Sequence, residues 1–205
     1  MEKSEKAILS AIYVCQIQGK ASFDTIREKE ILSDDEINSK IDGLVRKQLV
    51  NKDKKTLTEG GRDSLKVVLA GGVFDIIHPG HIYTLNAAKK LGDILVVVVA
   101  TDNTAVKMKK RTPLHTQDQR QELVNSLSMV DLCLIGQEDD IFKTVKHVKP
   151  QIIALGYDQI HQEQFIIEGC KKIGLSAKVA RLQSPIPGSS SSKITKEYGE
   201  SIHGL

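Results

Sequence analysis

The sequence contains little that would cross a membrane or build a metal or disulfide framework. Its longest apolar run, Ile94–Ala100, is too short for a bilayer-spanning helix, which needs about 20 residues. There is no tryptophan, and the three cysteines, Cys15, Cys133 and Cys170, lack CxxC spacing. The first residues, MEKSEK, contain no apolar signal-peptide segment. We therefore expect a cytoplasmic protein in a reducing compartment, with no metal ligated directly by its side chains and no membrane contact.

An excess of charge of one sign is also absent. The formal net charge of the 205 residues is +3, which is too small to indicate nucleic-acid binding by itself. The chain is 40% hydrophobic and 27% charged, as is typical of a globular protein with a buried core. Its length allows one or two domains.

Residues 1–65 have the short-range helical pattern of a small separate domain. Ser33 and Glu36 match the capping-box pattern that begins a helix. The predicted elements are a helix from Ala7 that ends at Gly19, a second helix over 23–30, a third that starts at Ser33, and a hairpin over 49–58. Three helices and a hairpin resemble a small winged helix-turn-helix domain.

The charge of this domain bears on whether it binds DNA. Residues 1–65 contain twelve basic and twelve acidic side chains, so their net charge is zero, whereas DNA-binding domains are usually basic. The helix that would enter a groove opens with the carboxylates of Asp34–Glu36, and only Lys52, Lys54 and Lys55 of the hairpin favour DNA. The balance favours a packing or dimerisation module, and DNA binding stays as the alternative.

From Lys66 onwards, short apolar runs alternate with segments of helical length. The predicted strands are Val67–Ala70, Ile94–Thr101, Leu132–Ile135, Ile152–Leu155 and Ala177–Ala180. This alternation predicts an α/β domain over 66–205, with a doubly wound, five-stranded parallel sheet of Rossmann-like type. Ligands of such sheets bind at the carboxyl ends of the strands, where Gly71–His81 follows the first strand.

Two histidines lie where this first connection becomes a helix. His78 is at the N-cap position, Pro79 favours the first helical position, and His81 follows three residues later, so both imidazoles can face one point. The free N–H groups and partial positive charge of a helix N-terminus attract anions. The pair therefore indicates a phosphate site, although each histidine alone could also be a simple helix cap.

The turn before these histidines fits the same interpretation. Gly71 and Gly72 allow a close approach, so the backbone N–H groups of Val73 and Phe74 are expected to contact phosphate. Asp75 is expected to order the turn rather than to bind metal.

An ordered series of motifs resembles the cytidylyltransferase-like nucleotidyltransferase superfamily. The series consists of GVFD at 72–75, HPGH at 78–81, LGD at 91–93, KMKKRTP at 107–113, QDQR at 117–120, VD at 130–131, ALGYDQ at 154–159 and SSSKI at 190–194. A single HPGH motif would be weak evidence. Eight motifs in the same order along the second domain make the resemblance specific.

The resemblance implies nucleotidyl transfer, in which a substrate phosphate attacks the α-phosphorus of a nucleoside triphosphate and pyrophosphate leaves. Such a reaction depends on positioning and charge stabilisation. The implied catalytic residues are His78, His81 and Lys107, and the implied nucleotide-binding residues are Gly72, Val73, Phe74, Pro79, Gly80, Lys109, Arg111, Asp158, Arg181, Ser190, Ser191 and Lys193.

Which lysine of the basic loop 107–110 faces the site is left open. Arg120 is a weaker candidate with a structural alternative. Mg²⁺, or another divalent cation, is expected to bind through the triphosphate oxygens.

Two departures concern the substrate. Glycerol-phosphate cytidylyltransferases have GDDW where this chain has Gly156–Gln159, and an arginine where it has Pro185. The overall pattern is more similar to archaeal-type FAD synthetases, which adenylate FMN with ATP and a divalent cation. Flavin binding would need an apolar, partly aromatic pocket, for which Tyr157, Phe165 and Tyr198 are candidates.

We therefore expect transfer of AMP from ATP to FMN, giving FAD. The alternatives are a CTP-dependent enzyme that acts on glycerol 3-phosphate or a similar phosphate, and a nucleotide- or flavin-responsive regulator that binds DNA. The resemblance also implies a homodimer.

Overall fold

The computed structural model describes residues 1–19, 33–156, 159, 162–183, 194 and 197. The chain divides into two compact units, Met1–Lys66 and Val67–Leu205. The second unit contains the predicted nucleotide site and is described first.

The second unit is built on a five-stranded parallel sheet of order β3-β2-β1-β4-β5. Its strands are β1 Val67–Gly72, β2 Ile94–Val99, β3 Leu132–Ile135, β4 Ile152–Leu155 and β5 Lys178–Arg181. The predicted α/β fold is confirmed, and each strand lies within two residues of its expected position. Most apolar residues of β1, β2 and β4 are buried because both faces of the sheet are covered there, whereas the residues of the edge strand β5 are half-buried or exposed.

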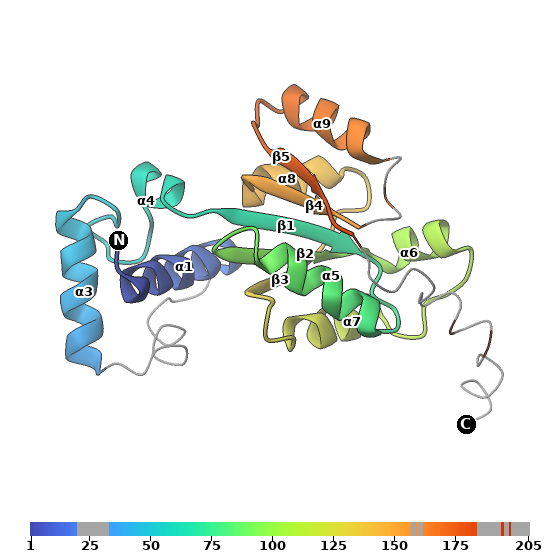
Figure 1. The fold of residues 1–205 in the computed structure, drawn as a ribbon, viewed down its shortest axis with the longest axis horizontal. Helices are drawn as coiled ribbons and strands as arrows, with labels where there is room; N and C mark the ends of the chain where they lie inside the picture. Colours follow the sequence, from blue (N-terminus) through green and yellow to red (C-terminus); the bar gives the residue numbers. More distant parts are fainter. Residues whose placement is uncertain (20–32, 157–158, 160–161, 184–193, 195–196, 198–205) are drawn as a thin grey trace. The chain divides into compact units, whose positions relative to one another are not determined.

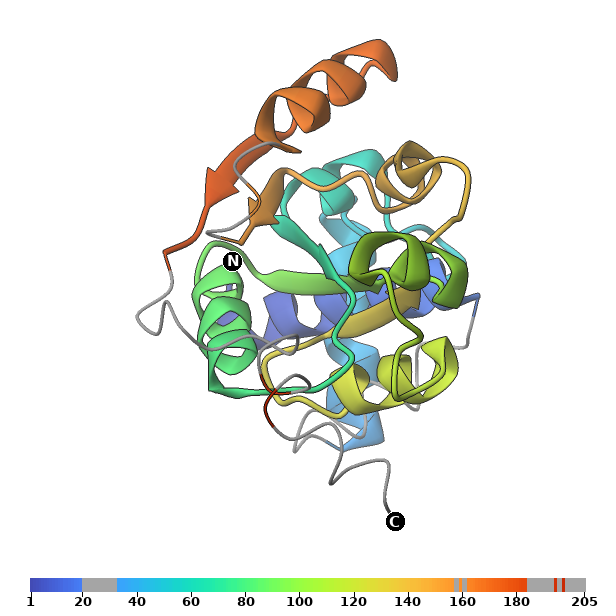
Figure 2. The ribbon, with the colours of Figure 1, turned by 90° about the vertical axis from the view of Figure 1, so that its right-hand side faces the viewer.

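Helices cover the two faces of the sheet in separate groups. The helices of this unit are α5 Pro79–Lys89, α6 Asp102–Lys109, α7 Gln117–Asn125, α8 Ile141–Val148 and α9 Glu163–Lys172. Figure 1 and Figure 2 show α5 and α7 on one face and α8 and α9 on the other. This is the doubly wound arrangement that the sequence predicts.

Alternate residues of each strand face these two layers. Val68 and Ala70 of β1 pack with Leu85 and Ala88 of α5 in the main core. Residues two apart on a strand share a face, so Leu69 and Gly71 lie on the opposite side, toward α8 and α9.

The first unit contains α1 Lys3–Gln18, α3 Asp34–Arg46 and α4 Glu59–Asp63. Gly19 ends α1 with a left-handed φ of 67°, and Ser33 and Glu36 form the expected capping box of α3. The predicted second helix over 23–30 lies outside the described residues. The small hairpin predicted for 49–58 is confirmed, because an antiparallel bridge joins Val50 and Leu57 and backbone hydrogen bonds join Asn51 to Thr56 and Thr58 to Leu49 around a polar turn.

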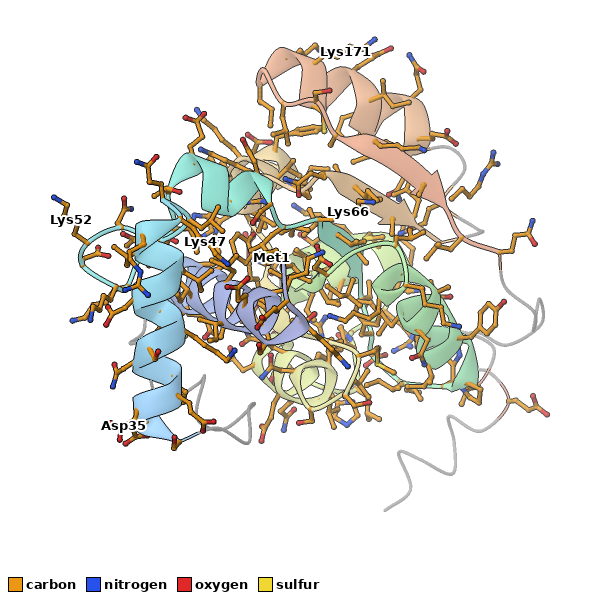
Figure 3. The ribbon with its side chains drawn as sticks, turned by 60° about the vertical axis from the view of Figure 1, so that its left-hand side comes forward. Met1, Asp35, Lys47, Lys52, Lys66 and Lys171 are labelled. Carbon is orange, nitrogen blue, oxygen red and sulfur yellow. The ribbon has the colours of Figure 1, made fainter. Side chains whose placement is uncertain are left out.

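The charges of this unit are separated along α3. Figure 3 shows Asp35 at one end of α3, Lys47 beyond the other end, and Lys52 on the turn that follows. Lys47 forms an ion pair of 2.6 Å with Glu5 of α1, so part of the positive charge is neutralised within the unit. The winged-helix assignment and the role of this unit stay predictions.

No helix among the described residues is long and apolar enough to span a bilayer. The cytoplasmic location stays a prediction from the sequence.

Candidate active site

The order of the strands determines where a ligand can bind. β1 lies between β2 and β4, and the chain reverses its direction of winding between β1 and β4, which makes this the switch point of the sheet. In open parallel sheets the crevice at the carboxyl ends of the strands at such a point binds ligands. The turn from Gly72 to His78 leaves β1 there and leads directly into α5.

His78 and His81 lie together at the start of α5. His78 is the N-cap residue and Pro79 begins the helix, as predicted, but the imidazole of His78 makes no capping hydrogen bond. The two ring centroids are 3.9 Å apart. The Nδ1 atoms of both rings are buried and have no hydrogen-bond partner among the described residues. Since buried polar atoms are normally paired, these two atoms indicate a ligand with hydrogen-bonding oxygens.

The environment keeps both histidines uncharged at neutral pH. Burial, followed by the charges of His78 and Lys109, lowers the pKa of His81 from 6.5 to about 4, against an opposing hydrogen bond with the backbone of Ile76. Burial and the charge of Lys109 also lower the pKa of His78. A neutral imidazole carries a single N–H, so each ring can donate one hydrogen bond, and that of His81 is engaged with the backbone of Ile76 in this structure.

The backbone of the turn is strained next to these rings. Phe74 has a φ of 54°, a left-handed conformation that is uncommon for a bulky residue, and its ring lies 5.1 Å from that of His81. A Cβ on Gly72 would lie 2.9 Å from the Phe74 ring, so glycine is needed for this packing. Strained turns of this kind are concentrated at ligand sites. Contact of phosphate with the N–H groups of Val73 and Phe74 stays a prediction.

Asp75 ties this turn to the segment that follows α6. Its side chain is 1% exposed and accepts hydrogen bonds from the backbone N–H groups of Leu114, at 2.7 Å, and His115, at 3.3 Å. Arg111 forms an ion pair of 2.7 Å with the other carboxylate oxygen. Asp75 therefore orders the turn, as predicted, and Arg111, which was predicted to bind phosphate, is held by a carboxylate.

Arg120 is completely buried and joins three separate backbone segments. Its guanidinium donates to the carbonyl oxygens of Val73, Ala100 and His115 at 2.7, 2.9 and 3.0 Å. It also forms an ion pair of 2.7 Å with Asp102. These bonds fix the end of β1 relative to the end of β2, so Arg120 positions the phosphate turn rather than contacting a ligand. The structural alternative predicted for Arg120 is the correct one.

The lysines at 107–110 were predicted to lie on a loop, and this is wrong. Thr101 caps α6 through Thr104, and the helix continues through Lys109 to a left-handed Lys110. Within the described part of the chain, Lys109 is the lysine whose charge lowers the pKa of both histidines. Lys107 and Lys109 are both exposed on this helix, and the influence of Lys109 on both histidines is what distinguishes it. The choice of Lys109 over Lys107 as the cation of the site stays a prediction.

The remaining predicted nucleotide ligands follow β4 and β5. Arg181 ends β5 and lies 3.7 Å from Glu163 in a half-exposed ion pair. Gly156 follows β4, and its N–H donates to the side chain of Gln159 at 2.8 Å. Asp158, Ser190, Ser191 and Lys193 lie outside the described residues, as do Tyr157 and Tyr198. Their roles stay predictions.

A pocket of about 470 Å³ opens on the α8–α9 face of the sheet, beside the histidine turn. Gly71 and Gly72 line its edge nearest that turn, and Met108, Ile141 and Phe165 line it from three different helices. Of these residues, only Phe165 was predicted from the sequence to line a flavin pocket. The other lining residues could not be grouped from the sequence because they belong to segments that are far apart along the chain. Ile141 could have been suspected, because it is an apolar residue that follows soon after the end of β3.

Within the described residues no group of three or more histidine, cysteine or acidic side chains could hold a metal ion. Asp75 is already committed to Arg111 and to two backbone N–H groups. These residues therefore fit a divalent cation that binds mainly to triphosphate oxygens better than one held by protein side chains alone.

Comparisons with known proteins agree with this geometry. A family model described as cytidylyltransferase-like matches residues 69–197. A protein named FAD synthase from Picrophilus torridus is 50% identical over 115 residues, which cover 56% of this chain and 82% of that protein. A FAD synthase from Methanosarcina barkeri is 46% identical over 132 residues, which cover 63% of this chain and 94% of that protein.

A solved structure also resembles the second unit. The crystal structure of a protein described as a lipopolysaccharide core biosynthesis protein from Thermoplasma volcanium is 44% identical, with a TM-score of 0.56. The match covers 58% of this chain and 98% of that one.

Proposed function

The chain belongs to the cytidylyltransferase-like family, and we propose that it is an FMN adenylyltransferase, which transfers AMP from ATP to FMN and releases pyrophosphate. The observation that carries the proposal is the His78–His81 pair at a helix N-terminus, whose two buried Nδ1 atoms have no hydrogen-bond partner in the part of the chain that the structure describes. The choice of AMP and FMN rests on the similarity to several FAD synthases.

In the proposed reaction a terminal phosphate oxygen of FMN attacks the α-phosphorus of ATP. The new P–O bond forms as the bond between the α-phosphorus and the oxygen bridging to the β-phosphate breaks, and that oxygen leaves with pyrophosphate. No protein nucleophile is needed, because the acceptor phosphate is already anionic. Negative charge moves onto the bridging oxygen, and donors aimed at it lower the barrier.

His78 and His81 supply these donors from the start of α5. His78 is the N-cap of α5 and His81 is its third residue, so both rings lie in the partial positive charge of the helix N-terminus. Lys109 adds a full positive charge close enough to lower the pKa of both rings. Arg120 and Asp75 hold the turn in place, so these groups are positioned before the substrate arrives.

A divalent cation such as Mg²⁺ would bind to oxygens of the triphosphate and neutralise part of its charge. The protein's part is then to bind the remaining phosphate oxygens. Removal of divalent cations with EDTA is expected to abolish turnover, and added Mg²⁺ is expected to restore it.

The test is a matrix of two nucleotides and two acceptors. Full-length protein is incubated with ATP or CTP, together with FMN or glycerol 3-phosphate, and pyrophosphate and nucleotide products are measured. We expect FAD and pyrophosphate in equal amounts from ATP and FMN. Product only from CTP and glycerol 3-phosphate would replace the assignment with the cytidylyltransferase alternative, and no product from any combination would refute nucleotidyl transfer for these substrates.

A further inference from the structure

The pocket beside the histidine turn has an unusual lining for a site that serves phosphorylated substrates. Among the residues that the structure describes, 21 line the pocket, and none of these is a lysine, arginine, aspartate, glutamate or histidine. Most of the lining is apolar, and it includes Leu69, Val98, Ile153 and Leu155 of the central strands. A volume of about 470 Å³ lies in the range of small-molecule sites. The pocket therefore suits an uncharged, largely apolar group.

The floor of the pocket is open because β1 has a glycine there. Gly71 shares a face with Leu69 and pairs with Val98 of β2, and all three line the pocket. A Cβ on Gly71 would meet only the carbonyl oxygen of Val98, at 3.6 Å, which is ordinary contact distance. No steric clash therefore requires glycine at this position, and its φ is not left-handed. The missing side chain leaves room for a flat group to lie against the sheet.

An aromatic ring borders the pocket from α9. Phe165 is 57% exposed, although it lines the pocket, and its ring centroid lies 5.3 Å from that of Phe142. Phe142 in turn packs over Gly169, where a Cβ would come within 1.8 Å of its ring. The three residues thus hold one exposed aromatic face at the pocket. Such a face, together with Met108 at 52% exposure, can stack on a planar ligand.

We propose that this pocket binds the isoalloxazine ring of the flavin acceptor, with the dimethylbenzene edge against the aliphatic floor around Gly71 and with Phe165 stacked at the ring. The proposal rests on the proposed function and gives it a specificity site. Gly71 and Gly72 belong both to the pocket and to the turn that leads to the histidines, so the flexible ribityl chain carries the phosphate from one to the other.

The polar residues of the lining fit the other edge of the ring. Gln137, Gln159 and Gln162 come from the segments that follow β3 and β4. A primary amide both donates and accepts, which matches the alternating carbonyl and N–H groups of the flavin pyrimidine edge. An adenine ring carries nitrogens or an amino group around most of its perimeter and has no comparable apolar edge, so this lining favours the flavin over the adenine of ATP.

The test uses riboflavin, which contains the ring but no phosphate and cannot react. Binding to full-length protein without ATP is followed by quenching of flavin fluorescence. Gly71→Val, which fills the floor, is expected to weaken riboflavin binding at least tenfold, with Gly71→Ala intermediate. Phe165→Ala is expected to weaken it about five- to a hundredfold, the range found when aromatic stacking on a planar base is removed.

The matched control is Leu123→Ala on α7, the opposite face of the sheet, where Leu123 is 43% exposed and is not part of the pocket. It is expected to bind riboflavin like the wild type. Circular dichroism checks that each variant is folded.

Three results would overturn the proposal: no riboflavin binding by the wild type, unchanged binding by both folded pocket variants, or a loss of ATP binding without a loss of riboflavin binding. The proposed function is tested separately, by measuring FAD formation. An active wild type whose pocket variants keep their KM for FMN refutes the pocket alone. An inactive wild type that binds riboflavin through Gly71 and Phe165 refutes the reaction alone.

Discussion

Replacing Arg120 with methionine should destabilise the second unit more than any exposed substitution. The change removes donors from three backbone carbonyl oxygens, at Val73, Ala100 and His115, and breaks the ion pair with Asp102. Because the Asp102 side chain is 46% exposed, solvent screens that pair and its share is small. The main cost is that carbonyl oxygens inside the fold lose a charged donor. Breaking a buried, charged hydrogen-bond network typically costs about 3–5 kcal/mol.

Urea unfolding followed by far-ultraviolet circular dichroism measures this loss, which is convenient since the chain has no tryptophan for fluorescence. Arg181→Met is the matched stability control. Its ion pair with Glu163 is 3.7 Å long and about half exposed, so a change below about 1 kcal/mol is expected. A loss under about 1 kcal/mol for Arg120→Met, equal to the control, would refute the conclusion that Arg120 fixes the end of β1.

Three further outcomes follow from the site. Lys109→Ala should lower kcat/KM at least tenfold more than Lys107→Ala, measured by pyrophosphate release, and equal losses would contradict the assignment of the cation. Below pH 6.5 the unfolded chain protonates His81 before the native chain does, because the native pKa is about 4. The free energy of unfolding should therefore fall as the pH drops from 7 to 5, and in matched urea titrations it should fall less steeply for His81→Asn than for the wild type. Parallel curves for the two proteins would show that His81 does not cause this pH dependence. Gly72→Val should displace the Phe74 ring and raise the KM for ATP, whereas an unchanged KM would show that the turn tolerates a side chain.

The sequence predicted the sheet well because parallel strands buried on both faces leave continuous apolar runs. Leu132–Ile135 and Ile152–Leu155 match their strands residue for residue. The capping box at Ser33 and the helix start at Pro79 were also predictable, since both depend on residues within one turn of chain.

The features that could not be predicted from the sequence depend on contacts between distant residues or on weak local patterns. Lys107–Lys109 were predicted as part of a loop because their run of charges gives no helical pattern of apolar residues, although the Thr101 cap begins a helix that includes them. The ion pair of Arg111 with Asp75, 36 positions away in the chain, could not be predicted from the sequence, and binding of phosphate by Arg111 stays a prediction. The pocket could not be found from the sequence, because Gly71 and Phe165 meet only after the sheet has formed.

The most direct test of the central claim follows the α-phosphate of ATP. Wild-type protein and His81→Ala are incubated with FMN, Mg²⁺ and ATP labelled with radioactive phosphorus at either the α or the γ position. We expect α label in FAD and γ label in pyrophosphate, with a rate about a hundred- to a thousandfold lower for the variant, as when one transition-state donor is removed. The account would be contradicted by γ label in the flavin product, by no labelled FAD from the wild type, or by less than a tenfold loss in the variant.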